Sequence, residues 1–162
     1  MTPAIELAKK LGLDYQIHEY THDSNAPSFG LEAAEKLGVG VTQVFKTLVV
    51  STEAGKLAVA ILPVDKLLNF KKMAKALSAQ KLVSCKKVQM AETKLVERST
   101  GYVLGGVSPL GQKKRLATII DSSAESQPTI YVSGGRRGLE IELPPAQLAN
   151  TINARFAVIT DE

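Results

Sequence analysis

Apolar residues recur along this chain at helical spacing in some segments and alternate with polar residues in others. Residues 3–11 have roughly helical spacing; Thr2 and Pro3 before them favour a helix start, and Gly12 after them favours a helix end. The same reasoning predicts further helices over residues 31–38, 65–77, 88–97 and 145–153. All of these predicted helices are short.

Short apolar runs predict strands between these helices. Residues 45–52 and 56–63 flank a short loop that contains Gly55, a pattern typical of a β-hairpin. Further strands are predicted over residues 15–20, 115–121, 128–133, 139–143 and 155–160, and residues 21–30 have the composition of a loop. With no internal repeat or linker, this mixture predicts a single α+β domain over residues 1–162, with many short strands and with helices at its margins.

The composition is that of an ordinary globular protein. Hydrophobic residues make up 44% and charged residues 22% of the chain, and the formal net charge of +4 permits a polyanionic partner without requiring one. The single cysteine, Cys85, excludes an internal disulfide framework and a thiolate metal cluster. No segment resembles a signal peptide or is apolar over the length of a bilayer. We expect a cytoplasmic protein with no membrane segment.

The common catalytic and cofactor motifs are missing. The sequence has no CxxC, HExxH, GxSxG or P-loop motif, and no GxGxxG after a strand. His18 falls in an alternating strand pattern and His22 in a loop, so the two histidines are not expected to share a helical face as metal ligands. A catalytic zinc ion also needs three protein ligands. We therefore expect neither a metal nor a cofactor.

Cys85 and a run of lysines allow two interpretations each. Lys86 and Lys87 could activate the Cys85 thiol as a nucleophile, although a lone cysteine is more often a small apolar filler. Between Asp65 and Glu92 there is no acidic residue, so the lysines of this segment form either a solvated helix face or a footprint for nucleic acid. They are Lys66, Lys71, Lys72, Lys75, Lys81, Lys86 and Lys87.

Two glycine-rich segments and one lysine are further candidates for a binding site. The glycines of "TGYVLGGVSPLG" and "SGGRRG" either bend a sheet or let a ligand approach bare backbone; Ser133, Arg136 and Arg137 flank the second set. Lys46 opens the apolar run of a predicted strand. An ammonium group there either reaches water along its stem or binds an anion such as a phosphate or carboxylate.

Four segments together closely resemble the YbaK-type aminoacyl-tRNA deacylases, which are free-standing relatives of the editing domain of bacterial prolyl-tRNA synthetase. They are "FGLEAAEKLG", "VFKTLVV", "STGYVLGGVSPLGQKKR" and "IYVSGGRRGLEIEL", in this order. The resemblance covers nearly the whole chain. It implies a compact α+β fold around a mixed, barrel-like sheet, and hydrolysis of the ester in mischarged Cys-tRNA(Pro). It also implies action after prolyl-tRNA synthetase has mischarged the tRNA, with that enzyme as a partner.

The resemblance also implies roles for individual residues. Lys46 matches the functional lysine of the family and would hold the terminal phosphate or ribose, while backbone N–H groups of Gly101 or Gly134 would hold the developing oxyanion. Substrate-binding roles are implied for Tyr20, Phe29, Thr47, Ser133, Gly135 and Arg136. A mechanism in which the thiol of the substrate cysteine attacks its own carbonyl would explain the missing catalytic dyad.

Other functions remain open at this stage. The residues alone do not distinguish cysteine from alanine or serine as the amino acid removed. A non-catalytic module that captures the aminoacylated end of tRNA would use the same residues. A general nucleic-acid-binding protein would rely on the lysines of 66–91 instead.

Overall fold

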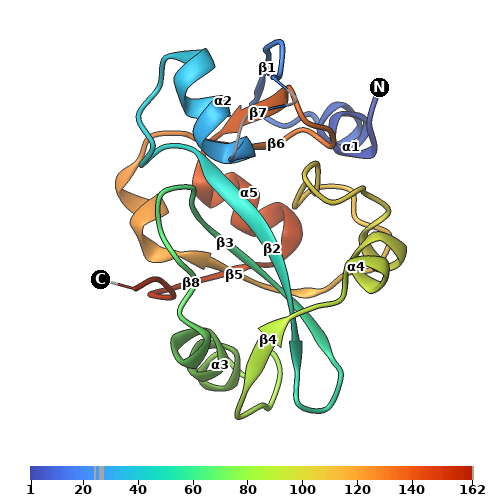
Figure 1. The fold of residues 1–162 in the computed structure, drawn as a ribbon, viewed down its shortest axis with the longest axis vertical. Helices are drawn as coiled ribbons and strands as arrows, with labels where there is room; N and C mark the ends of the chain where they lie inside the picture. Colours follow the sequence, from blue (N-terminus) through green and yellow to red (C-terminus); the bar gives the residue numbers. More distant parts are fainter. Residues whose placement is uncertain (24, 26–27, 162) are drawn as a thin grey trace.

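The computed structural model describes residues 1–23, 25 and 28–161, which form short helices and strands (Figure 1). The helices are α1 (Pro3–Leu11), α2 (Phe29–Leu37), α3 (Phe70–Ala79), α4 (Thr93–Thr100), the 3-10 helix η1 (Ser122–Ser126) and α5 (Pro145–Ile152). The strands are β1 (Gln16–Glu19), β2 (Phe45–Thr52), β3 (Leu57–Pro63), β4 (Val88–Met90), β5 (Ala117–Asp121), β6 (Ile130–Ser133), β7 (Leu139–Leu143) and β8 (Arg155–Ala157). None of the described helices is long and apolar enough to cross a bilayer.

Helix α1 has the predicted bounds, whereas α2 and α3 begin elsewhere because of their caps. Helix α2 begins at Phe29, two residues before the predicted start, because the Ser28 hydroxyl accepts the N–H of Leu31 and caps the helix. Helix α3 begins at Phe70 rather than at residue 65, because Asn69 caps it in the same way. Part of the predicted loop 21–30, residues 24, 26 and 27, lies outside the described residues.

The helix predicted over residues 88–97 is wrong for its first half. Val88–Met90 form β4, which pairs antiparallel with Val50–Thr52 of β2, and α4 begins only at Thr93. Pairing with β2 fixes the backbone of this segment as a strand, which local periodicity could not show. The other predicted strands are confirmed, with ends shifted by a few residues.

The strands form two sheets that meet at one seam. The three-stranded antiparallel sheet has the order β1-β7-β6, and the mixed five-stranded sheet has the order β4-β2-β3-β5-β8, in which β3, β5 and β8 are parallel neighbours. At the seam the N–H of Tyr131 donates to the carbonyl of Gln43 (2.8 Å), and Val44 forms an isolated bridge with Tyr131. The predicted α+β fold with a mixed sheet is confirmed, and the described strands do not close into a barrel.

The first half of β2 has an open edge. Strand β4 covers only Val50–Thr52, and the N–H of Ala91 donates to the carbonyl of Val49. Because alternate residues of an antiparallel strand direct N–H and C=O to the same side, Thr47 presents both groups to that edge. Among the described residues, neither the pairing with β4 nor the bridge between Val44 and Tyr131 reaches Thr47.

The two faces of β2 contact different parts of the core. Leu48 and Val50 pack on the face covered by α3, together with Met73 and Leu77 of that helix. Phe45 contributes to the opposite face, in the larger cluster. By alternation, Lys46 projects on the α3 side and Thr47 on the other side.

Candidate active site

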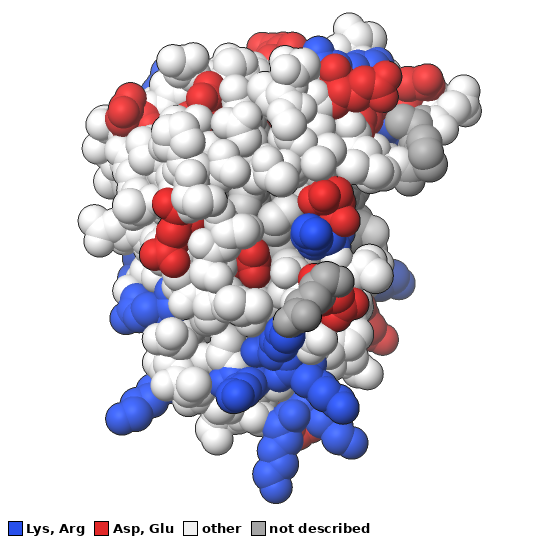
Figure 2. Space-filling model, turned by 90° about the vertical axis from the view of Figure 1, so that its left-hand side faces the viewer, with Lys and Arg blue, Asp and Glu red and all other residues white. Residues whose placement is uncertain are grey.

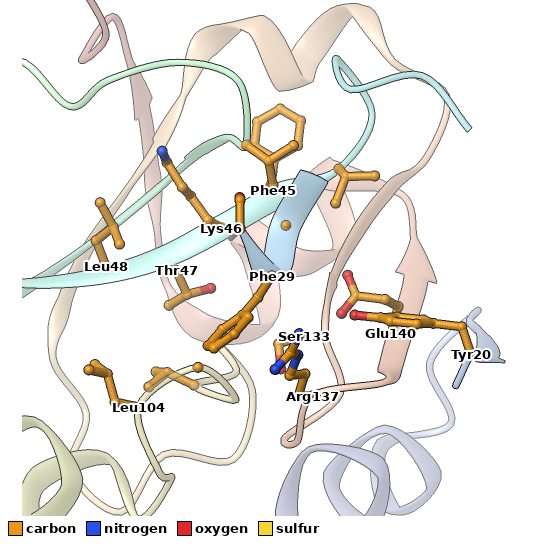
Figure 3. A pocket seen from close by; sticks show the side chains of 16 residues that line it. Tyr20, Phe29, Phe45, Lys46, Thr47, Leu48, Leu104, Ser133, Arg137 and Glu140 are labelled. Carbon is orange, nitrogen blue, oxygen red and sulfur yellow. The ribbon is translucent and has the colours of Figure 1, made fainter. Parts of the chain in front are cut away.

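A pocket of about 300 Å³ lies at the open edge of β2 (Figure 3). Its walls come from the start of β2, the start of α2, the loop that follows α4, and the β6–β7 hairpin. The polar side chains in its lining are Tyr20, Ser28, Lys46, Thr47, Ser133, Arg137 and Glu140. The pocket therefore combines groups from both sheets.

Most of the residues implied by the family resemblance meet in this pocket. Tyr20, Phe29, Lys46, Thr47 and Ser133 all line it, although they come from four separate segments of the chain. In Figure 3 the Phe29 ring lies centrally, with Tyr20 on one side and Lys46 on the other. The roles expected for these residues are taken up below as proposals.

Gly101 and Gly134 do not line the pocket, and their N–H groups are already bonded. Gly101 ends α4 and donates to the carbonyl of Glu97 (2.9 Å), while Gly134 donates to the carbonyl of Leu139 (2.8 Å). The structure thus corrects the expectation that either glycine offers a free donor to an oxyanion.

Gly135 and Arg136 also lie outside the pocket lining. The N–H of Gly135 donates to the Ser133 hydroxyl (3.1 Å), so this glycine shapes the hairpin loop. Arg136 is exposed and lies 3.6 Å from the carboxylate of Glu19. The following residue, Arg137, is the arginine that reaches the pocket.

Lys46 is half-buried and forms no ion pair with any residue that the structure describes. Burial lowers the pKa of its ammonium group, and the nearby carboxylate of Asp65 opposes that shift. The ammonium group points away from the Thr47 side chain (Figure 3). The fold therefore leaves a partly desolvated cation at one end of the pocket.

Among the described residues, Thr47 Oγ1 is the one side-chain polar atom that is fully shielded from solvent and lacks a hydrogen-bond partner. Its hydroxyl points toward the Phe29 ring in Figure 3, and its N–H faces the open edge of β2. Leaving a buried hydroxyl unpaired costs about 1–3 kcal/mol, a cost that a bound ligand could remove.

Glu140 is a pocket residue that the sequence analysis missed. Its side chain is buried, with the residue only 7% exposed, and it accepts no hydrogen bond from the described residues. Burial raises its pKa to about 8, which favours the protonated carboxyl group at neutral pH. Tyr20 lies beside it (Figure 3). Burial raises the pKa of Tyr20 the most, and the charge of Glu140, when ionised, raises it further. Pairing the predicted strands 128–133 and 139–143 would have placed Glu140 opposite Ser133.

Phe29 and Arg137 form one wall of the pocket. The guanidinium carbon of Arg137 lies 4.0 Å from the centre of the Phe29 ring, and Arg137 also pairs with Glu32 (3.0 Å). On the loop after α4, a side chain at Gly105 would come within 2.4 Å of the Phe29 ring. The ring can pack here only because that position is a glycine.

The other candidate residues lie elsewhere. His18 contacts Glu142 (2.9 Å) on the three-stranded sheet, and Cys85 precedes β4, where its Sγ lies 3.7 Å from the carbonyl of Ala74. Neither residue lines the pocket. In the described part of the chain, no group of three or more His, Cys, Asp or Glu residues could hold a metal ion.

Known proteins resemble this chain over most of its length. The family model for the aminoacyl-tRNA editing domain matches residues 24–151. EbsC of Enterococcus faecalis, provisionally named a Cys-tRNA(Pro)/Cys-tRNA(Cys) deacylase, is 35% identical over 159 residues, covering 98% of this chain and 93% of EbsC. The uncharacterized protein YwhH of Bacillus subtilis is 26% identical over 118 residues, covering 73% of this chain and 71% of YwhH.

Solved structures share the fold. A protein provisionally named a trans-editing enzyme for prolyl tRNA synthetase superposes with a TM-score of 0.84 at 20% identity, covering 99% of this chain and 96% of that protein. The hypothetical protein APE2540 superposes with a TM-score of 0.82 at 28% identity, covering 98% of this chain and 99% of that one. Together with the family match and the identity to EbsC, this agreement shows that the chain belongs to the aminoacyl-tRNA editing domain family.

Proposed function

We propose that this protein is a trans-editing deacylase for cysteinyl-tRNA, acting on Cys-tRNA(Pro) and also on Cys-tRNA(Cys). Membership of the editing family makes the reaction class hydrolysis of an aminoacyl-tRNA ester. The choice of cysteine is supported by the name of EbsC and by the resemblance to YbaK-type enzymes. The observation that carries the proposal is the meeting of Lys46, Thr47 and Glu140 in one pocket, with no side-chain partner among the described residues.

The order of these groups across the pocket matches the order of groups in an aminoacyl ester. Glu140 lies on one side of the Phe29 ring and Thr47 on the other, and the Lys46 ammonium group points away from both (Figure 3). The substrate has an α-ammonium group, then the ester carbonyl, then the ribose and phosphate of the tRNA end. We assign Glu140 to the α-ammonium group, whose charge would favour the ionised carboxylate. Lys46 holds the terminal phosphate or ribose.

The role of oxyanion donor, expected from the sequence for the N–H groups of Gly101 or Gly134, is assigned here to Thr47. Its N–H faces the open edge of β2 and its hydroxyl is unpaired, so both can donate to the carbonyl oxygen as negative charge develops there. Donors fixed by a strand need no reorganisation during the reaction. An aminoacyl ester is already reactive, so positioning and these donors supply much of the catalysis.

The nucleophile in this proposal belongs to the substrate. The thiol of the esterified cysteine attacks its own carbonyl carbon, so a C–S bond forms and the C–O bond to the ribose breaks. The thiol proton passes to the ribose oxygen, and the released cyclic thiolactone is then opened by water. Cys85 lies outside the pocket lining and takes no part.

Two further assignments belong to the proposal. Prolyl-tRNA synthetase is the proposed partner, because one structural relative is named for it. The pocket can hold only the acceptor end of a tRNA, so a partner would have to recognise the rest of the tRNA. The cytoplasm is the proposed location, because charged tRNA is used there. Deacylation of alanyl-tRNA is the alternative, and alanine has no thiol, so water would have to attack.

A panel of mischarged tRNAs, varied in both amino acid and tRNA body, tests the proposal. At catalytic protein concentration the protein should discharge Cys-tRNA(Pro) and leave Pro-tRNA(Pro) intact. Faster discharge of Ala-tRNA(Pro) would favour the alternative. Protection of the ester at one protein per tRNA would instead indicate a non-catalytic binding module.

Lys46→Ala should lower kcat/KM on Cys-tRNA(Pro) about 100-fold or more, since the variant loses the cation that fixes the tRNA end. Cys85→Ala is the matched control and should keep full activity. Retained activity in the first variant, or its loss in the second, would contradict these roles.

A further inference from the structure

Exposed lysines cover the side of the molecule next to the Lys46 end of the pocket. We call them the basic surface: Lys66, Lys71, Lys75, Lys81, Lys86 and Lys87. None of them pairs with a carboxylate in the described part of the chain. Two acids border this surface: Glu53, whose carboxylate accepts backbone N–H groups of Lys86 and Lys87, and Asp161, whose carboxylate accepts the side-chain amide of Asn69 at the start of α3 (2.9 Å). Figure 2 shows basic side chains gathered at one end of the molecule with few acidic ones among them.

Helix α3 carries its charges in an order that does not favour helix stability. A helix is stabilised by acids in its first turn and by bases in its last; α1 and α2 follow this rule at both ends, whereas α4 and α5 have no acid in their first turn. Helix α3 has no acid in its first turn and no base in its last; Lys71 and Lys72 lie in the first turn. Lys71 and Lys75 are also four residues apart, where like charges repel by a few tenths of a kcal/mol. The interaction with the helix dipole therefore gives Lys71 and Lys75 no stabilising role in α3.

The basic surface adjoins the pocket. Helix α3 packs over Leu48 and Val50 of β2, on the same face as Lys46. Strand β2 ends at Thr52, six residues after Lys46, so its far end lies roughly 20 Å from Lys46 at about 3.3 Å per residue. Lys66 lies just after Val64, which lines the pocket. A chain of phosphates leaving the pocket at Lys46 would therefore meet these lysines next.

We propose that the basic surface binds the phosphate backbone of the tRNA acceptor stem while the unpaired 3′ end enters the pocket. The inference rests on the proposed function and adds the part of the substrate that the pocket is too small to hold. Lys72 is excluded from it, because its ammonium group donates to the carbonyl of Thr160 (2.9 Å) and so has a structural role. Phosphate contacts of this kind give affinity and depend steeply on salt, but they do not read sequence.

The test is the double charge reversal Lys71→Glu/Lys75→Glu. Both side chains are exposed, and an acid in the first turn of α3 should stabilise the helix, so the variant is expected to fold. Lys9→Glu/Lys10→Glu, on the exposed end of α1, is the control for an equal change of net charge; acids in the last turn disfavour this helix, so a thermal melt verifies that the control is folded. Each protein is assayed with full-length Cys-tRNA(Pro) and with cysteine esterified to a CCA trinucleotide. Fluorescence anisotropy with uncharged tRNA(Pro) measures binding directly.

We expect the α3 variant to raise KM on full-length tRNA about tenfold or more with kcat unchanged, and to leave cleavage of the trinucleotide ester as it is in the wild type. The slope of log affinity against log salt should flatten by roughly 1 to 2. An unchanged KM and tRNA affinity would overturn the inference, as would an equal effect of the α1 control.

The proposed function and this inference fail in different ways. A wild-type protein that cleaves neither substrate contradicts the proposed function. A wild-type protein that cleaves its substrates, together with an α3 variant that does so equally well, contradicts the inference alone. Binding of the wild type to anionic phosphatidylserine vesicles, lost in the α3 variant while tRNA affinity is kept, would assign the basic surface to a membrane instead.

Discussion

Two glutamates on one face of β7 have opposite environments. Glu142 accepts the Thr129 hydroxyl (2.6 Å) and contacts His18 (2.9 Å), and these contacts, with Thr129 the larger, hold its pKa below the ordinary value. Glu140, two residues earlier, has no such partner among the described residues, and burial raises its pKa to about 8. The residue type, the strand and the face are the same.

The comparison shows how this fold separates structural from functional polar groups. At the Glu142 end each polar group has a protein partner, so it stabilises the fold. At the Glu140 end the fold supplies burial without partners, and Thr47 across the pocket shares that condition. Groups at the first end should therefore affect stability when changed, and groups at the second end should affect activity.

Among the changes that test this comparison, the largest expected effect is at Thr47. Thr47→Pro removes the N–H at an open strand edge, where no ladder hydrogen bond is lost, and should lower the single-turnover rate about 100-fold. Thr47→Val, the matched control, keeps the N–H and replaces the unpaired hydroxyl; it should lower the rate only a few-fold and stabilise the protein by about 1 kcal/mol. Thermal melts confirm folding of both. Full activity of the proline variant would remove the backbone donor from the mechanism.

Glu140→Gln should lower kcat/KM about tenfold, because the variant cannot hold the substrate ammonium group with a full charge. N-acetylated Cys-tRNA has no such charge, and both proteins should cleave it equally. Equal losses on both substrates would show that Glu140 does not bind the amine.

Glu140→Gln also tests the comparison through the pH dependence of the free energy of unfolding. The folded pKa of Glu140 is about 8 and lies above its ordinary value of 4.5. The wild type therefore loses stability relative to Glu140→Gln as pH rises from 4.5 to 8, by roughly 4 to 5 kcal/mol at most. Urea unfolding across this range measures the difference. A constant difference would mean that Glu140 has a partner in solution.

The smallest expected effect is at the other end of β7. Glu142→Gln should cost about 1 kcal/mol of stability at neutral pH and leave the deacylation rate unchanged. Because the folded pKa of Glu142 is lowered, this cost should vanish as pH falls through that pKa. A large loss of activity in this variant would break the comparison.

Much of the fold could be predicted from the sequence because its signals are local. The residues around α1 mark both ends of that helix, and Gly55 marks the β2–β3 hairpin. The helix predicted at Val88–Met90 was wrong because the backbone there is fixed as a strand by pairing with β2, and no local sequence pattern reveals such a long-range contact.

The site was predictable only in part. Lys46 and Thr47 could be placed through a family resemblance, but the burial of Glu140 depends on the hairpin and helices that enclose it. In "LEIEL" the two glutamates alternate with apolar residues in the same way, so nothing local separates them. Likewise, the bonded N–H groups of Gly101 and Gly134 are visible only in the folded backbone.

The seam between the sheets has a consequence for the protein during its own synthesis. Lys46 and Thr47 belong to the sheet on one side of the Gln43–Tyr131 contact, while Ser133 and Glu140 belong to the hairpin on the other side. That hairpin leaves the ribosome last among these parts. On the proposed function, a nascent chain carries only half of the pocket, so it cannot discharge the aminoacyl-tRNAs that are still extending it.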